Sequence, residues 1–198
     1  MKIQLNVIFV LLFISTTLLS QNKNRTHNIT IDDYFTQSYI SKCEASPNGK
    51  FATFNKLEWD KEIDGRNSDI FLINLDTKEI DQLTSSKQNE TDPQWDKNSK
   101  QLYFIGRDKD KDNNTPGSDG SKQVWRIDVD GDDLTQITKV QGGIADYKIS
   151  SDGKSLYYTV HKDHMINEWK ELRKEFESEL KFGHGIHKIT ELYKLNLS

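Results

Sequence analysis

The most regular feature of the sequence is a turn followed by an apolar run, and it occurs three times. The turns are Ser46–Lys50, Asp96–Lys100 and Ser150–Lys154, and they begin 50 and 54 residues apart. Each leads into a short segment rich in aromatic and aliphatic residues. The Asn-Gly and Asp-Gly pairs of the first and third turns tolerate the positive φ of tight hairpins. The segments after the turns are therefore predicted to be β-strands.

A second predicted strand follows in each copy. Residues 69–75, 123–129 and 191–197 have a strand-like composition. The second and third of these segments alternate polar and apolar residues, as half-buried strands do. Each copy thus contains at least two consecutive strands that can pair.

The end of each copy is also regular. The first two copies close on Gln82–Thr84 and Gln136–Thr138, and the next copy opens eight residues after each threonine, at Asp92 and Asp146. Four short strands in a unit of roughly 50 residues are typical of a propeller blade. We therefore predict an all-β chain, an incomplete β-propeller of about three blades over residues 39–198. A β-sandwich with accidentally similar turns is the alternative.

One helix is predicted inside the third copy, at about residues 164–181. Apolar residues recur there every three or four positions, with charged residues between them. They are Met165, Ile166, Trp169, Leu172, Phe176 and Leu180. Such an amphipathic helix could pack on its own propeller, or dock to a hydrolase domain or to another chain.

The N-terminus differs from the rest of the chain. Lys2 precedes an apolar run over residues 7–19, and polar residues follow. This arrangement is typical of a secretory signal peptide, and the run is short for a membrane span. We expect residues 1–20 to be a signal peptide, 21–38 to be a lead segment, and the protein to be periplasmic or secreted, with no stable membrane span after cleavage. An uncleaved anchor is the alternative.

Charge and cysteine content limit the partners and the chemistry. The formal net charge of −4 and the lack of a basic stripe argue against a nucleic-acid partner. Cys43 is the only cysteine, so an internal disulfide is impossible. We expect Cys43 to be a small buried residue of a strand.

Two groups of polar residues have a spacing that resembles metal-ligand patterns. Two His-x-x-His pairs flank the predicted helix, namely His161, His164, His184 and His187. Four aspartates occupy positions 1, 3, 5 and 12 of a loop, namely Asp108, Asp110, Asp112 and Asp119. However, Asn113 stands where a calcium loop has glycine, and no carboxylate or thiol is fixed beside the histidines. We predict no metal, cofactor or catalytic site, and metal binding at either group is the open alternative.

The repeats resemble the propeller repeats of prolyl oligopeptidase-type serine peptidases, especially the acylaminoacyl-peptidase and dipeptidyl-peptidase branch. TolB-like propellers share the same repeat. The resemblance covers about residues 31–198. It rests on Ser46–Lys50, Ser151–Lys154, Leu83-Thr84, Ile137-Thr138, the opening Asp33–Phe35, and the exit Gly183–Ile186 that leads into Glu191–Tyr193.

In that family the propeller filters peptides that enter a cavity above an α/β-hydrolase domain. The family's catalytic serine lies on a Gly-x-Ser-x-Gly elbow and is followed by an aspartate and a histidine. This sequence contains no such motif, and no family catalytic residue can be carried over to it. The resemblance implies the substrate-gating propeller of an exported peptidase, cut off before the hydrolase domain and inactive alone.

Two alternatives to this function stay open. A TolB-like periplasmic propeller would bind proteins and have no enzymatic activity, and the chain could also be a non-functional gene remnant. In the peptidase interpretation, peptides reach the protein through the hydrolase domain that this chain lacks. Open blade edges are also expected to favour self-association.

Overall fold

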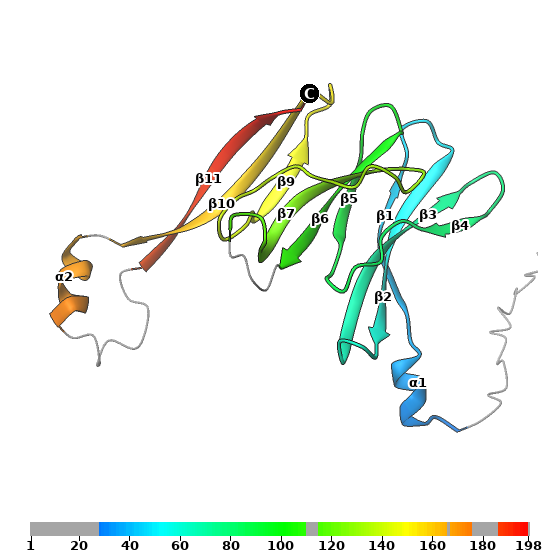
Figure 1. Cartoon of the computed structure of the whole chain (residues 1–198), viewed down its shortest axis with the longest axis horizontal. Coiled ribbons are helices and arrows are strands. Elements are labelled where there is room, and N and C mark those ends of the chain that lie inside the picture. Colours follow the sequence, from blue (N-terminus) through cyan, green and yellow to red (C-terminus); the bar gives the residue numbers. More distant parts are fainter. Residues whose placement is uncertain (1–27, 110–114, 166, 176–185, 198) are drawn as a thin grey trace, which may run out of the picture.

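Three antiparallel β-sheets follow one another along the chain (Figure 1). The computed structural model describes residues 28–109, 115–165, 167–175 and 186–197. The expected signal peptide, residues 1–20, lies outside this part of the chain. Within the described part, no helix has both the length and the apolar character needed to cross a membrane.

Each sheet is built from strands in sequence order, joined by hairpins. The first has the order β1(Tyr39–Ala45), β2(Phe51–Asp60), β3(Gly65–Asn74), β4(Ile80–Gln82). The second has the order β5(Thr91–Trp95), β6(Gln101–Lys109), β7(Asp119–Asp128), β8(Thr135–Gln136). The third has β9(Asp146–Ile149), β10(Ser155–Met165), β11(Ile186–Asn196). These sheets are the three predicted blades, and we refer to them as blades 1, 2 and 3.

The three predicted turns form equivalent hairpins between the first two strands of each blade. One residue in each turn has a left-handed backbone: Gly49 at φ +69°, Ser99 at +59° and Gly153 at +71°. Each donates its backbone N–H to the residue three positions earlier, at 2.9, 3.2 and 2.9 Å respectively. Glycine enters this region without strain, which explains why the motif marks the hairpins so clearly.

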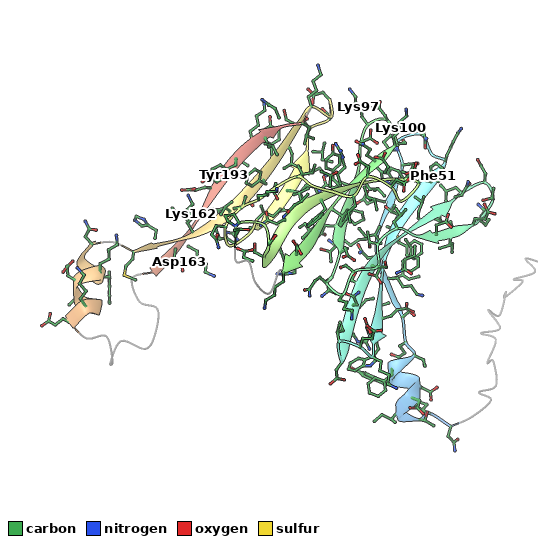
Figure 2. All side chains as sticks on the ribbon, viewed as in Figure 1. Phe51, Lys97, Lys100, Lys162, Asp163 and Tyr193 are labelled. Atoms are coloured by element: carbon green, nitrogen blue, oxygen red, sulfur yellow. The ribbon has the colours of Figure 1, made fainter. Side chains whose placement is uncertain are left out.

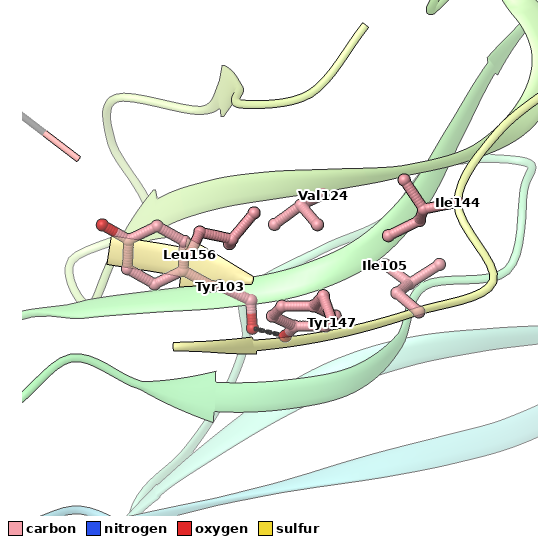
Figure 3. Packing of buried hydrophobic residues seen from close by; sticks show 6 residues of the cluster. All are labelled: Tyr103, Ile105, Val124, Ile144, Tyr147 and Leu156. Carbon is pink, nitrogen blue, oxygen red and sulfur yellow. Dashed lines mark hydrogen bonds between the residues drawn. The ribbon is translucent and has the colours of Figure 1, made fainter. Parts of the chain in front are cut away.

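Two apolar cores hold the blades together, one at each seam between neighbouring blades. Side chains alternate along β6, because successive residues of a strand point to opposite faces. Leu102 and Phe104 pack with Ile70 of blade 1. Tyr103 and Ile105 instead join the cluster that contains Leu156 of blade 3 (Figure 3). The middle blade is therefore covered on both faces, and the prediction of an all-β, incomplete propeller is confirmed.

The outer edges of blades 1 and 2 close by the same hydrogen bond. Thr84 Oγ1 accepts the backbone N–H of Ile70 at 2.9 Å, and Thr138 Oγ1 accepts that of Val124 at 2.8 Å. Both threonines are buried. The repeated Leu-Thr or Ile-Thr motif therefore has a structural cause, since its hydroxyl partners an N–H of the third strand.

A short helix precedes β1. Helix α1 (Ile31–Phe35) begins after Thr30, whose backbone N–H donates to the Asp33 carboxylate at 2.6 Å. Phe35 packs on Trp59 of β2 with ring centroids 4.8 Å apart. The Arg66 guanidinium lies over the Tyr34 ring at 5.3 Å. The Asp33–Phe35 segment therefore anchors the chain on the end of the β2–β3 hairpin.

The strands β10 and β11 extend beyond the third sheet as a two-stranded ribbon. Strand β9 pairs with β10 only over Leu156–Thr159, whereas β11 pairs with β10 as far as Met165. Helix α2 (Asn167–Glu175) lies at the far end (Figure 1). Met165, predicted to be helical, is the last residue of β10, because cross-strand pairing with Ile186 outweighs the helical spacing of the sequence. Ile166 and residues 176–181 of the expected helix lie outside the described part.

The expectation for Cys43 is wrong. Cys43 is exposed, as are all residues of β1. Strand β1 belongs to the first blade, whose outer face has no covering sheet among the described residues. Its position in a strand was predicted correctly, but its burial was not.

Candidate functional site on the inner strands

The first strands of the three blades, β1, β5 and β9, lie next to one another, and we call them the inner strands. Strands β1 and β5 each contain a β-bulge at the same position of the repeat. The bulges contain Lys42 at φ +53° and Asp92 at φ +55°. Residues other than glycine rarely adopt this backbone conformation, and bulges redirect side chains.

The two bulge residues pair with each other across the first seam. Lys42 Nζ and an oxygen of Asp92 lie 2.9 Å apart. The hydrogen bond to the Asp92 carboxylate raises the pKa of Lys42. Since both side chains are substantially exposed, the pair contributes little to stability, and about 0–1 kcal/mol is typical of such pairs. Its main consequence is that it fixes where the two charges lie on the inner strands.

Side chains of β5 connect all three inner strands by hydrogen bonds to backbone groups. Trp95 Nε1 donates to the Glu44 carbonyl at 3.1 Å. The side-chain amide of Gln94 instead forms hydrogen bonds with backbone groups of blade 3. Its Nε2 donates to the Tyr147 carbonyl at 3.1 Å, and its Oε1 accepts the N–H of Ile149 at 3.3 Å.

Tyr147 of β9 is a buried residue whose hydroxyl lies between blades 2 and 3. Its hydroxyl contacts two backbone carbonyls of blade 2. One is that of Asp92 at 2.7 Å, and the other is that of Tyr103 at 2.9 Å (Figure 3). Burial raises the pKa of Tyr147. The group therefore stays a neutral hydrogen-bond donor at physiological pH, and it holds β9 against blade 2.

A cavity of about 410 Å³ opens where the inner strands meet the hairpin turns. It is lined by Glu44, Pro47, Gln94, Trp95, Lys97, Lys148, Ile149, Ser150 and Ser151. Lys97, which is labelled in Figure 2, lies in the hairpin turn between the first two strands of blade 2. The lining offers an indole surface, an amide, two hydroxyls and more cations than carboxylates. These groups can hydrogen-bond a polar or extended ligand, and the Ser150 hydroxyl among them donates to the Asp152 carboxylate at 2.5 Å.

The two histidine pairs are only partly within the described residues. His161 Nδ1 is hydrogen-bonded to Thr190 Oγ1 at 3.0 Å on the ribbon. The backbone of β11 places His187 opposite His164. His184 lies outside the described residues. Nearby, Lys162 and Glu191 form an ion pair of 2.5 Å beside Tyr193 (Figure 2), and the Glu191 carboxylate raises the pKa of Lys162.

The aspartate loop is likewise only partly described. Asp108 accepts a hydrogen bond from Ser118 at 2.9 Å. Asp119 accepts bonds from Ser121, from Gln141 and from the Gly142 N–H. Asp110 and Asp112 lie outside the described residues. In the part of the chain that is described, no three His, Cys, Asp or Glu residues form a group that could hold a metal ion.

The sequence did not reveal the residues that connect the inner strands. Asp92, Gln94 and Tyr147 lie in the segments that open the second and third repeats, and their position in the repeat was the available signal. Their partners are backbone groups of a neighbouring blade, which no local pattern identifies.

No protein-family model matches the chain. Its curated relatives include proteins named as peptidases. Dipeptidyl-peptidase 5 of Porphyromonas endodontalis is 26% identical over 140 residues, which is 71% of this chain and 19% of that protein. The uncharacterized peptidase YuxL of Bacillus subtilis is 25% identical over 132 residues, or 67% of this chain and 19% of that protein. The chain thus spans about a fifth of the length of the curated relatives it matches.

The solved structures show the same fold at lower sequence identity. The acylaminoacyl peptidase of Pyrococcus horikoshii is 13% identical and superposes with a TM-score of 0.56. That match covers 83% of this chain and 24% of the peptidase. It indicates how the three sheets are arranged, and it carries no information about chemistry.

Proposed function

We propose that the three blades are the substrate-filtering propeller of an exported serine peptidase of the prolyl oligopeptidase type. In this proposal the blades select peptides, and a hydrolase domain outside these 198 residues cleaves them. The observation that carries the proposal is the similarity, over 140 residues, to a protein named dipeptidyl-peptidase 5.

The inner strands suit a filtering role. Their side chains are held by bonds to neighbouring blades, so the surface is ordered without a ligand. The cavity beside the turns offers Lys97 and Lys148 at its rim. A peptide can meet such groups through its carbonyls and carboxylates, since lysine ammonium groups donate hydrogen bonds to both. In the described residues, no serine hydroxyl is hydrogen-bonded to a histidine.

The first test concerns the serine chemistry. We expect the 198-residue chain to stay unlabelled by a fluorophosphonate probe, because it lacks the nucleophile elbow and its oxyanion hole. The gene should continue, in frame or after a frameshift, into a segment that encodes Gly-x-Ser-x-Gly. Protein that includes that segment should be labelled and should release dipeptides or acylated residues from peptides.

Two results would contradict the proposal. One is stoichiometric labelling of any serine in the 198-residue chain. The other is a gene that encodes further blades and then stops, which would instead support a TolB-like binding propeller.

The second test concerns export. Because Lys2 precedes the apolar run 7–19, we expect removal of about twenty residues and a mature chain that begins at or near Gln21. Intact-mass analysis of secreted or periplasmic protein measures this directly. Recovery of the full-length chain from the inner membrane would contradict export by cleavage.

A further inference from the structure

A carboxyl group is buried at the seam between blades 1 and 2. Glu90 ends the loop that joins β4 to β5, and only 4% of its surface is exposed. Its backbone N–H donates to the Ser68 carbonyl at 2.8 Å, which holds the loop on β3. One carboxyl oxygen accepts a hydrogen bond from the Ser86 hydroxyl. The other, Oε2, receives no N–H or O–H from any described residue.

The group next to Glu90 is a second carboxyl, that of Asp69 on β3. The Asn67 amide links the two sites, because its Nδ2 lies 3.2 Å from Asp69 Oδ1 and 2.6 Å from the carbonyl oxygen of Ser86, the residue whose hydroxyl donates to Glu90. Asp69 also accepts the amide N–H groups of Asn67 and Gln82, each at 3.2 Å. Two adjacent carboxylates repel each other strongly in a buried site, whereas a carboxylic acid donates to a carboxylate.

The second seam supplies an internal comparison, because the third strand and the closing segment of blade 2 repeat those of blade 1 with an offset of 54 residues. At that offset Ile144 replaces Glu90, and Gln123 replaces Asp69. Ile144 is an apolar member of the second core. The Gln123 amide is fully satisfied: it donates to Ser121 and to the Val140 carbonyl, and it accepts from Thr138 and the Val140 N–H. The blade architecture therefore does not require an acid at either position.

A small cavity of about 200 Å³ lies beside Glu90, between the two blades. Blade 1 lines it with Thr84, Ser86 and Glu90, and blade 2 with Phe104, Trp125 and neighbouring residues. The charged groups of blade 2 on this cavity are Arg107 and Asp108. On the blade 1 side, Glu58 and Asp60 oppose ionisation of Asp69, and Lys56 favours it. An ionised Glu90 would thus lie beside the Asp69 carboxylate on one side and a largely apolar cavity on the other.

We propose that Glu90 and Asp69 form a proton-sharing carboxyl pair that fastens the loop 83–90 onto β3 beside the first seam, and that loss of the shared proton loosens this loop and the seam next to it. The fastened form is the one in the structure, with Glu90 as the acid. The proton leaves to water when the pH rises, and no other reactant is needed. This inference is independent of the proposed function.

The direction of the pH effect follows from the burial of the pair. Burial raises the pKa of Glu90 to about 7, and burial also raises that of Asp69. A carboxyl whose pKa is higher in the folded chain than in the unfolded chain stabilises the fold at pH values below its unfolded pKa, about 4.5. That stability is lost as the pH rises to about 7. The unfolding equilibrium constant is expected to rise by at most roughly 300-fold across this window.

Other carboxyls act in the opposite direction and at lower pH. Hydrogen bonds or ion pairs lower the pKa of Glu58, Asp119, Asp152 and Glu191. Their stabilisation is present above their ordinary values of about 4 and is lost only when the pH falls below them. The interval between about pH 5 and pH 8 therefore separates the Glu90–Asp69 pair from these carboxyls, and the Glu90 variants separate it from groups such as histidines that also titrate there.

The test compares the whole chain with its Glu90→Gln variant at pH 5 and pH 8. Amide hydrogen exchange of residues 83–90 and of Ser68 is the local readout, and urea denaturation is the global one. The glutamine amide can donate to Asp69 permanently, so the variant should behave at both pH values as the original chain does at pH 5. Glu79→Gln, at an exposed glutamate before β4, is the matched control and should keep the original pH response.

A second variant tests the same prediction without the side-chain amide of Glu90→Gln, which could itself destabilise the buried site. Glu90→Ile introduces the residue found at the equivalent place in the second seam. In the original chain, exchange of these amides should be faster at pH 8 than at pH 5 after correction for intrinsic exchange rates. Glu90→Ile should abolish this acceleration, as Glu90→Gln should. The proposal is overturned if both variants keep the acceleration of the original chain, or if the original chain shows none.

Discussion

Replacing Leu156 by alanine is expected to lower the free energy of unfolding by about 2–5 kcal/mol, the range for large-to-small changes in a packed core. Leu156 is fully buried in the cluster that joins blades 2 and 3 (Figure 3). The cavity left behind would separate Tyr103 and Val124 of blade 2 from blade 3. Since single domains have total stabilities of about 5–15 kcal/mol, this loss would be a large fraction. Urea denaturation followed by circular dichroism measures it.

Leu192→Ala is the matched control for that experiment. Leu192 lies on the neighbouring strand β11 and keeps 69% of its surface exposed. Removing its side chain takes little apolar surface out of contact with other residues, so stability should change by less than about 0.5 kcal/mol. Equal losses in the two variants would mean that blade 3 does not pack on blade 2 as described.

The isolated chain is expected to self-associate and to melt without a sharp transition. Blades 1 and 3 each have one face that no other described sheet covers. Exposed apolar residues on these blades include Tyr39, Ile40, Ile189 and Leu192. Repeat arrays without capping neighbours lose solubility before they lose secondary structure, and open strand edges template pairing.

Light scattering, dye binding and circular dichroism of residues 21–198 test this expectation. We expect oligomers with a β-rich spectrum, and a monomer with a sharp transition once the sequence that follows in the gene is added. Leu192→Lys on the open face should reduce association, whereas Leu134→Lys, on the exposed β7–β8 connection, should not. A monodisperse monomer of 21–198 that melts cooperatively would contradict the expectation.

The repeats could be predicted from the sequence because their signals are local. Left-handed turn residues such as Gly49 and Gly153, and the closing Thr84 and Thr138, recur at fixed offsets and satisfy backbone groups of their own blade. Each signal involves residues that are near each other in the sequence or paired in one hairpin. The strand order within each blade follows from them directly.

The inner strands and the first seam could not be predicted in the same way. Gln94 and Tyr147 bond to backbone groups about 53 to 55 residues away, and those contacts exist only once the blades have stacked. The exposure of Cys43 depends on whether another sheet covers β1, which no pattern within β1 encodes. Glu90 lies in the connection before β5, and no local pattern of the sequence indicates that it is buried.

The two-stranded ribbon formed by β10 and β11 beyond the end of β9 would make helix α2 move farther than the blade edge when the ribbon tilts. About six residue pairs of β10 and β11 continue past Thr159 without a third strand, and at about 3.3 Å per residue they extend roughly 20 Å. A two-stranded segment resists twisting less than a full sheet does. A tilt of about ten degrees at Val160 would therefore carry α2 through roughly 3–4 Å, while the core around Leu156 stayed in place. Small adjustments at the edge of the blade are thus converted into larger displacements at a helix far from the inner strands.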